Sequence, residues 1–171
     1  EISAGSGNVS EFAFFSYFGR LNYDFDGKYL LKASIRRDGS SRFGSANRYG
    51  VFPAFSAGWV ISKEDFLSSS NTISLLKLRA SWGKTGNAEI GNFASRDLWG
   101  ANSYKQLPGY SANQPENKDL TWEKSTQTDF GLDFGLFSNR ISGEIDYYDK
   151  KTEGLLFYQN ISYTSGYSNI Y

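Results

Sequence analysis

Two acidic residues, Asp133 and Glu144, are the first candidates for chemistry in this chain of 171 residues. The strand pattern described below places them opposite each other, as a general acid and its base partner would be placed. However, the sequence contains no His, Cys or Met, so it lacks histidine bases, thiol nucleophiles and the usual zinc ligands. We therefore interpret the two carboxylates as charges neutralised by their neighbours, and we expect no enzymatic activity, no cofactor and no metal.

A polar, glycine-rich stretch at residues 39–49 carries the next candidates, which are for binding. An Arg side chain forms bidentate hydrogen bonds with anions, and an aromatic ring stacks on cations or flat ligands. Four residues would either contact an anionic or sugar ligand or fold the loop onto itself or onto a partner: Arg42, Phe43, Asn47 and Arg48. The 18 basic and 18 acidic residues of the chain balance, so nothing in the charge points to nucleic acid.

A second stretch, residues 86–121, shows no regular period and is predicted to be a long loop. Loops of this length are usually functional or disordered. Its aromatic residues would stack on sugar rings, contact a partner protein or simply pack the loop: Trp99, Tyr104 and Tyr110. The sequence does not favour one of these three roles over the others.

The elements that carry these candidates show a period of two. From Phe15 to Phe25 every second residue is aromatic, aliphatic or glycine, and the residues between them are mostly polar or charged. The alternation returns at residues 29–38, 51–61, 75–86, 122–136 and 141–150. Alternation over about ten residues predicts tilted strands that cross a bilayer, with one face toward lipid and the other toward a wet lumen. A soluble barrel is the alternative that periodicity alone leaves open.

The turn after the first strand tests the register. Pairing Phe25 with Tyr29 keeps the apolar side chains of both strands on one face, whereas a plain two-residue turn would mix polar and apolar neighbours. We therefore expect an odd-numbered turn or a bulge. Gly27 is the residue that would supply the positive φ such a turn requires.

The other short connections are predicted in the same way. A two-residue turn at Ser138 and Asn139 pairs Leu136 with Ile141, which keeps their faces in register. Between the third and fourth strands, Ser62 is expected to cap one helical turn. The remaining connections, at residues 39–49, 86–121 and 151–171, are long. Short turns alternating with long loops are typical of outer-membrane barrels, in which the long loops are extracellular.

These registers assign side chains to the two faces of an all-β, antiparallel, up-and-down barrel wall. The charged residues predicted to face the lumen are Arg20, Lys32, Arg36, Arg79, Asp129, Asp133, Glu144 and Asp146. The aromatic residues predicted to lie at the membrane interfaces, in contact with outer-membrane lipid, are Phe25, Tyr29, Trp59 and Trp82.

Three longer strings resemble one family: RRDGSSRF at residues 36–43, LRASWGKTGN at 78–87 and DLTWEKSTQTDFGLDFGLF at 119–137. The chain is similar to the SusC/RagA family of TonB-linked outer-membrane transporters from Bacteroidetes. The resemblance implies a large transmembrane barrel of about 22 strands in the Gram-negative outer membrane. It also implies import of oligosaccharides or oligopeptides, a SusD-like surface lipoprotein as a partner, and energy from TonB acting on a plug domain.

The family's plug domain and TonB-contact segment have no counterpart in this sequence, so their roles cannot be assigned to its residues. We therefore expect residues 1–171 to be one partial barrel segment of about six to eight strands. The alternative is a small, self-closing eight-stranded outer-membrane barrel with a structural or adhesive role, for which this length suffices.

Overall fold

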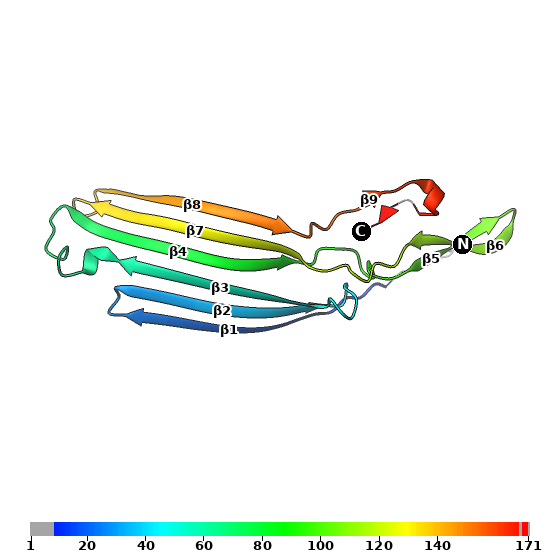
Figure 1. The fold of residues 1–171 in the computed structure, drawn as a ribbon, viewed down its shortest axis with the longest axis horizontal. Coiled ribbons are helices and arrows are strands. Elements are labelled where there is room, and N and C mark those ends of the chain that lie inside the picture. Colours follow the sequence, from blue (N-terminus) through cyan, green and yellow to red (C-terminus); the bar gives the residue numbers. More distant parts are fainter. Residues whose placement is uncertain (1–8, 168, 171) are drawn as a thin grey trace, which may run out of the picture.

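The computed structural model of the protein describes residues 9–167 and 169–170, apart from the side chains of residues 104, 163 and 169. One antiparallel sheet dominates it, with the strand order β1-β2-β3-β4-β7-β8 (Figure 1). Its strands are β1 (Phe14–Phe25), β2 (Tyr29–Ser40), β3 (Tyr49–Val60), β4 (Ile73–Asn87), β7 (Glu123–Leu136) and β8 (Ile141–Glu153). The smaller elements are η1 (Ile61–Lys63), β5 (Leu98–Tyr104), β6 (Leu107–Gln114), β9 (Gln159–Asn160), η2 (Tyr163–Ser165) and β10 (Asn169–Ile170).

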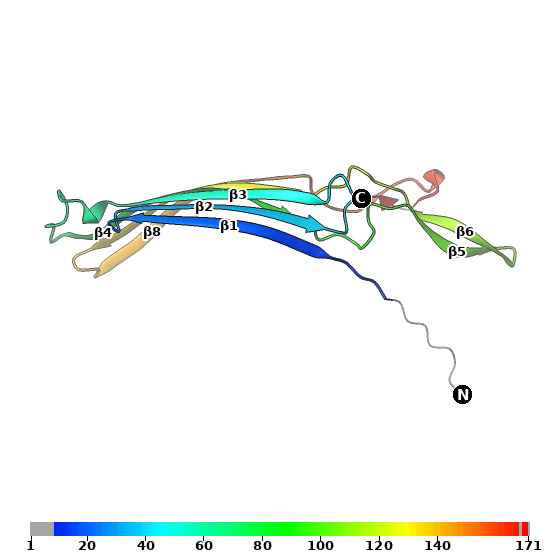
Figure 2. The same ribbon diagram turned by 90° about the horizontal axis from the view of Figure 1, so that it is seen from below.

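The sheet is a long, gently curved single layer (Figures 1 and 2). The turns β1–β2, β3–β4 and β7–β8 lie at one end, here called the turn end, and the long connections lie at the other, the loop end. Because the six strands form a linear order, β1 and β8 are its two edges and the sheet is open. This open wall argues against a self-closing barrel made of these strands. In the part of the chain that the structure describes, no helix is long and apolar enough to cross a bilayer.

The predicted register of the first hairpin is confirmed. Phe25 pairs with Tyr29 across the three-residue turn, and the pairing continues to Phe14 and Ser40. Gly27 has φ +59°, as expected, and Lys28 N donates to the carbonyl of Phe25 at 3.0 Å. The requirement that apolar side chains share one face therefore decided the turn geometry.

The turn between β7 and β8 also follows the prediction. Leu136 pairs with Ile141, and the N–H of Arg140 donates to the carbonyl of Phe137 at 3.3 Å. Ser138 and Asn139 have φ values of 57° and 62°. Phe137, which precedes them, also has positive φ (52°), and its N–H donates to the carbonyl of Thr72 at 2.8 Å, so the predicted register is kept by a turn that differs from a plain type I′ turn.

The prediction of an unstructured loop at residues 86–121 is wrong, because this segment contains the β5–β6 hairpin. Its turn residues, Lys105 and Gln106, both have positive φ (49° and 66°) although neither is Gly, Asn or Asp. The usual sequence signal of a hairpin turn is therefore absent. Gly100 and Asn102 further weaken the strand pattern of β5.

The predicted helical cap at Ser62 is also wrong. The chain enters the 3₁₀ helix η1 directly from β3, with Val60 as the capping residue and no side-chain hydrogen bond at the cap. Val60 N donates to the carbonyl of Lys28 at 2.8 Å, so the neighbouring turn fixes this entry. At the other end of the chain β8 continues to Glu153, and the predicted loop at residues 151–171 contains β9, η2 and β10.

The register sorts the strand side chains onto two faces. All of the charged residues predicted to face the lumen lie on one of them, the polar face: Arg20, Lys32, Arg36, Arg79, Asp129, Asp133, Glu144 and Asp146. The opposite side, the aromatic face, carries Leu21, Leu31, Phe55, Leu78, Phe130 and Tyr147. Most of these aromatic-face side chains are exposed, because no second layer covers the sheet.

The buried hydrophobic core lies at the loop end rather than behind the sheet. It is formed by Phe43, Phe52, Ile90, Ala94, Leu120 and Trp122, and we call it the loop core. The loops thus hold one another in a compact unit at this end of the wall, and the β5–β6 hairpin projects beyond it (Figures 1 and 2).

Candidate functional site

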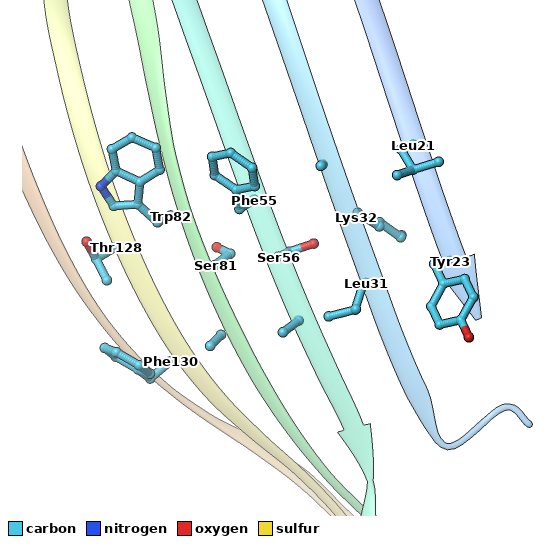
Figure 3. Close-up of a pocket in the computed structure, with 13 residues that line it drawn as sticks. Leu21, Tyr23, Leu31, Lys32, Phe55, Ser56, Ser81, Trp82, Thr128 and Phe130 are labelled. Atoms are coloured by element: carbon cyan, nitrogen blue, oxygen red, sulfur yellow. The ribbon is translucent and has the colours of Figure 1, made fainter. Parts of the chain in front are cut away.

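The aromatic face forms a continuous apolar surface. In Figure 3 the side chains of Leu21, Leu31, Phe55, Trp82 and Phe130 stand side by side on neighbouring strands. Small residues on the same face leave two depressions between the rings, of about 650 and about 730 Å³. An exposed apolar surface of this extent marks an interaction or membrane surface. Because it is lined almost wholly by hydrocarbon, it suits acyl chains rather than a polar substrate.

Three of the aromatic residues predicted for the membrane interfaces gather at the turn end of this face. The rings of Tyr29 and Trp59 stack with centroids 6.4 Å apart, and Phe25 lies 6.3 Å from Tyr29. The fourth, Trp82, stacks on Phe55 at 6.0 Å near the middle of β3 and β4. The turn-end group is what an aromatic belt at the boundary between lipid and water would present, and the interface role of Trp82 stays a prediction.

At the turn end a carboxylate holds two of these rings. The hydroxyl of Tyr29 and the indole N–H of Trp59 both donate to Oε1 of Glu64, at 2.8 and 2.9 Å. The ammonium of Lys28 lies 3.6 Å from the second oxygen of Glu64. The hydrogen bond from Trp59, then that from Tyr29, and the nearby Lys28 charge lower the pKa of Glu64 below its ordinary value. Sequence reasoning missed Glu64, since the contact joins residues 35 positions apart.

We predict that the contact of Glu64 with Tyr29 and Trp59 makes the folding stability of the protein depend on pH. Because the pKa of Glu64 is lower in the folded state, its contribution is present above the ordinary Glu pKa of about 4.3 and is lost as the pH falls through the folded value. The thermal midpoint of the full-length protein should therefore fall more on acidification than that of Glu64→Gln. Glu64→Gln retains an acceptor for both rings but does not titrate. Parallel curves for the two proteins between pH 7 and pH 3 would contradict the prediction.

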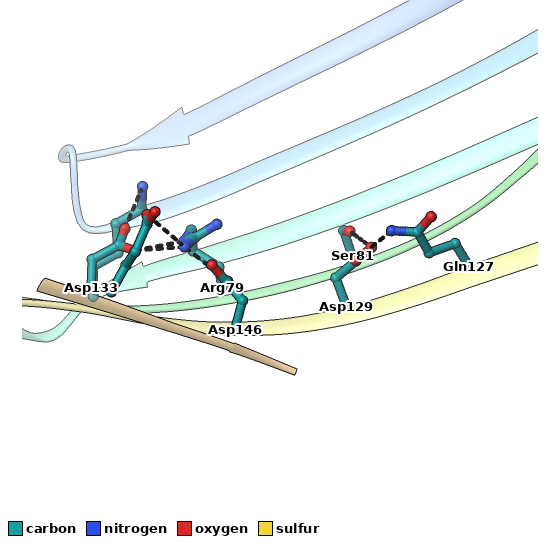
Figure 4. Close-up of polar contacts among 8 residues, drawn as sticks. Arg79, Ser81, Gln127, Asp129, Asp133 and Asp146 are labelled. Carbon is teal, nitrogen blue, oxygen red and sulfur yellow. Dashed lines mark hydrogen bonds and ion pairs between the residues drawn. The ribbon is translucent and has the colours of Figure 1, made fainter. Parts of the chain in front are cut away.

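The polar face carries a cluster of charges centred on Arg79 (Figure 4). Its Nε donates to Asp133 Oδ1 at 2.8 Å, and its Nη2 lies 3.0 Å from Asp146 and 3.6 Å from Glu144. Lys77 adds a contact of 3.6 Å to Asp133. Asp133 and Glu144 do lie opposite each other, as predicted, and the shared guanidinium confirms that neighbouring charges neutralise them.

We predict that removing this cation destabilises the wall. In Arg79→Gln the carboxylates of Asp133, Glu144 and Asp146 repel one another, with Lys77 as the remaining cation of the cluster. The side chains are partly exposed and screened by solvent, so we expect a small but measurable fall in the thermal midpoint. Adding Asp133→Asn removes one repelling charge and should recover part of that loss in a double-mutant cycle of thermal midpoints. Additive effects of the two substitutions would show that they do not share an interaction.

The first loop folds onto its neighbours rather than presenting a free surface. Phe43 is 2% exposed and packs against Trp122, so of the two predicted alternatives this ring follows the one in which the loop folds onto itself. The guanidinium of Arg42 donates to Asn92 at 3.0 Å and to the carbonyl of Ala88 at 3.2 Å. These contacts correspond to the predicted alternative in which the loop folds on itself.

Asn47 and Arg48 also form hydrogen bonds that hold the loop end together. The amide of Asn47 donates to the carbonyl of Lys118 at 3.1 Å, and the backbone carbonyl of Arg48 accepts the indole N–H of Trp122 at 3.2 Å.

The hairpin presents aromatic rings to solvent. Trp99 pairs with Ala112, and Ala101 pairs with Tyr110, so both rings lie on the same face of the hairpin. Trp99 is 61% and Tyr110 80% exposed. The side chain of Tyr104 lies outside the described part of the chain. Packing of the loop interior is therefore not the role of Trp99 or Tyr110, and both remain candidates for contact with a partner or cargo.

Comparison with known proteins places this geometry in a family. Residues 2–170 match the model described as "TonB dependent receptor-like, beta-barrel". The TonB-dependent receptor P39 of Formosa agariphila is 46% identical over 91% of the chain, and the TonB-dependent receptor SusC of Bacteroides thetaiotaomicron is 48% identical over 82%. The structure of the RagAB peptide transporter superposes with a TM-score of 0.88 at 41% identity over 96% of the chain. The chain spans 15% of each of the two curated relatives and 18% of the RagAB chain.

Proposed function

The chain belongs to the TonB-dependent receptor β-barrel family of the outer membrane, and from this we propose that it forms part of the wall of a transporter that imports oligosaccharides or oligopeptides. The observation that supports this role best is the two-faced single-layer sheet. One face is apolar and suits lipid, while the other carries charges that require water or polar neighbours.

The proposed partners follow from the relatives and from the two ends of the wall. One relative is named SusC and another structure is described as the RagAB peptide transporter, which supports a SusD-like lipoprotein as a partner of this chain. The loop end, with the projecting hairpin and its exposed Trp99 and Tyr110, is the part we propose for that contact or for cargo. TonB would act through a plug domain on the energy-dependent step.

Uptake by whole cells tests the proposal. A strain that lacks the full-length gene should lose accumulation of labelled oligopeptides or oligosaccharides, and complementation should restore it. Deleting TonB from the wild-type strain should abolish the same uptake. Uptake that persists without TonB would instead indicate a passive pore, and unchanged uptake in the deletion strain would overturn the proposed role. Affinity purification of the full-length protein should also recover the lipoprotein.

A further inference from the structure

Positive charge gathers at the loop end of the aromatic face, on three neighbouring strands. Lys84 of β4 pairs with Thr126 of β7, and Thr126 pairs with Lys151 of β8. Lys124 lies two residues along β7 from Thr126, so it is a diagonal neighbour of both other lysines. Paired strands lie about 4.8 Å apart and diagonal neighbours about 7–8 Å apart, so the three lysines form a triangle with Thr126 in the middle of one side. We call this set the lysine triangle.

The contacts of neighbouring rings show that the triangle lies on the aromatic face. The ammonium of Lys84 lies 5.8 Å from the ring centroid of Trp82, which itself stacks on Phe55. The alternation of β7 places Lys124 on the same face as Phe130. This is the face that we assign to lipid, so neither cargo nor a plug domain inside the barrel would reach the triangle.

The triangle carries more positive charge than its neighbours neutralise. The ammonium of Lys151 lies 2.6 Å from a carboxylate oxygen of Glu153, whereas Asp149 on the same face of β8 forms no ion pair with any described residue. Lys84 and Lys124 are exposed and, among the described residues, have no ion-pair partner either. The aromatic face of β4 and β7 carries no acidic residue. Both strands have a neighbour on each side in this chain, so further wall strands add no partner directly beside these two lysines.

The triangle lies where the apolar surface of these strands ends. Trp59, in the turn-end group of rings, pairs with Leu78, and Leu78 pairs with Leu132. Lys124 is eight residues beyond Leu132 toward the loop end, about 27 Å along the strand. Strand tilt shortens this height to about 20 Å, and a lysine stem extends its ammonium several Å further toward water, which matches an apolar band about 25 Å tall. We therefore place the ammonium groups at the depth of lipid headgroups.

An apolar depression begins directly beside the triangle. Trp82 and Thr128 pair with each other, one side-chain row nearer the turn end than Lys84 and Thr126. Both line the depression of about 650 Å³ on the aromatic face, which continues past Phe130 (Figure 3). Cations thus stand at the end of a surface lined by hydrocarbon. A phosphate headgroup and its acyl chains follow each other in the same order.

We propose that the lysine triangle binds the phosphate group of an anionic outer-membrane lipid, whose acyl chain lies in the depression beside Trp82. The phosphate contacts Lys84 and Lys124, and it has Lys151 and the hydroxyl of Thr126 at its edge. Phosphate oxygens accept several charge-assisted hydrogen bonds, and each Lys near an anionic membrane surface strengthens binding about fivefold. A zwitterionic headgroup carries its own cation, so it gains less from the triangle. The wall would therefore select among the lipids that surround it.

Native mass spectrometry of the purified full-length protein tests this site. The probes are dioleoyl phosphatidic acid and dioleoyl phosphatidylcholine, which share their acyl chains and differ in headgroup charge. The wild type should bind phosphatidic acid about 20-fold more tightly than phosphatidylcholine. Lys84→Gln and Lys124→Gln should each weaken binding of phosphatidic acid about fivefold and leave binding of phosphatidylcholine unchanged. The double variant should no longer distinguish the two lipids.

Lys32→Gln and Lys150→Gln, singly and together, are the matched controls, since each removes one lysine from the polar face of the same wall. They should keep the preference of the wild type. Equal losses in the controls would show a general effect of net charge and would overturn the proposal, as would an unchanged preference in the double variant of Lys84 and Lys124. Inorganic phosphate at the same concentration should not displace phosphatidic acid. Displacement would show that the triangle takes a free anion rather than a lipid.

The same preparations separate lipid from a protein occupant of the triangle. If the double variant lost a copurifying lipoprotein or a second copy of the chain but kept its lipid preference, the lysines would belong to a protein interface and the proposal would be refuted. The measurement involves no uptake, so it stands or fails independently of the proposed cargo.

Discussion

Trp122→Ala is expected to cost the loop core about 3–5 kcal/mol, the usual range for truncating a buried Trp to Ala. The indole is 2% exposed and packs against Phe14, Phe43 and Phe52, with ring centroids 5.8, 5.2 and 5.4 Å away. It also donates to the backbone carbonyl of Arg48. The core joins segments that are distant in the sequence, so its loss should release the loops as a unit.

Limited proteolysis of whole cells measures this effect, because the loops are expected to be extracellular. Trp122→Ala should be cleaved within residues 41–48 and 88–121, while the barrel itself stays assembled, since local openings need not unfold the whole. Trp122→Phe serves as the control: it keeps most of the packing and loses the hydrogen bond, worth about 1 kcal/mol. Loops in the Ala variant that resist protease as well as those of the wild type would refute this account of the core.

Ile145→Arg is expected to lower the amount of assembled protein sharply. Ile145 lies on the aromatic face of β8, opposite Leu132, and is 63% exposed. A lipid-facing Arg costs about 2–4 kcal/mol at the bilayer midplane. The quantity to measure is heat-modifiable full-length protein in outer-membrane fractions.

Tyr148→Arg is the matched control on the same strand. Tyr148 is 68% exposed but lies on the polar face, opposite Asp129, where a new cation meets water and a carboxylate. It should assemble as the wild type does. Equal losses in the two variants would show that the faces have been assigned wrongly.

The strands and their faces were predictable because a period of two is a local property. In a single-layer wall each residue has one of two environments, so alternation alone assigns Leu21 to one face and Arg20 to the other. The same alternation places Arg79 and Asp133 on one face, but their contact depends also on the register between β4 and β7, which is set by distant segments. The turn at Gly27 followed from matching the faces of β1 and β2.

The loop end was not predictable in this way, because its structure rests on contacts between distant segments. Phe43 looks like a binding residue in the sequence, yet Trp122, far along the chain, covers it. The β5–β6 turn uses Lys105 and Gln106, which carry no turn signal. Glu64 belongs to a connection whose composition suggested only a helical turn, and its role depends on rings from β2 and β3.

A wall one layer thick also separates the demands that selection places on the chain. Within the twelve residues of β1, side chains at odd positions are constrained by contact with lipid, and side chains at even positions are constrained by contact with the contents of the barrel. Because the two sets of side chains touch only through the backbone between them, substitutions in one set should combine additively with those in the other. The inward-facing residues can therefore be substituted one at a time during evolution, which changes cargo specificity, while the lipid-facing residues between them stay the same.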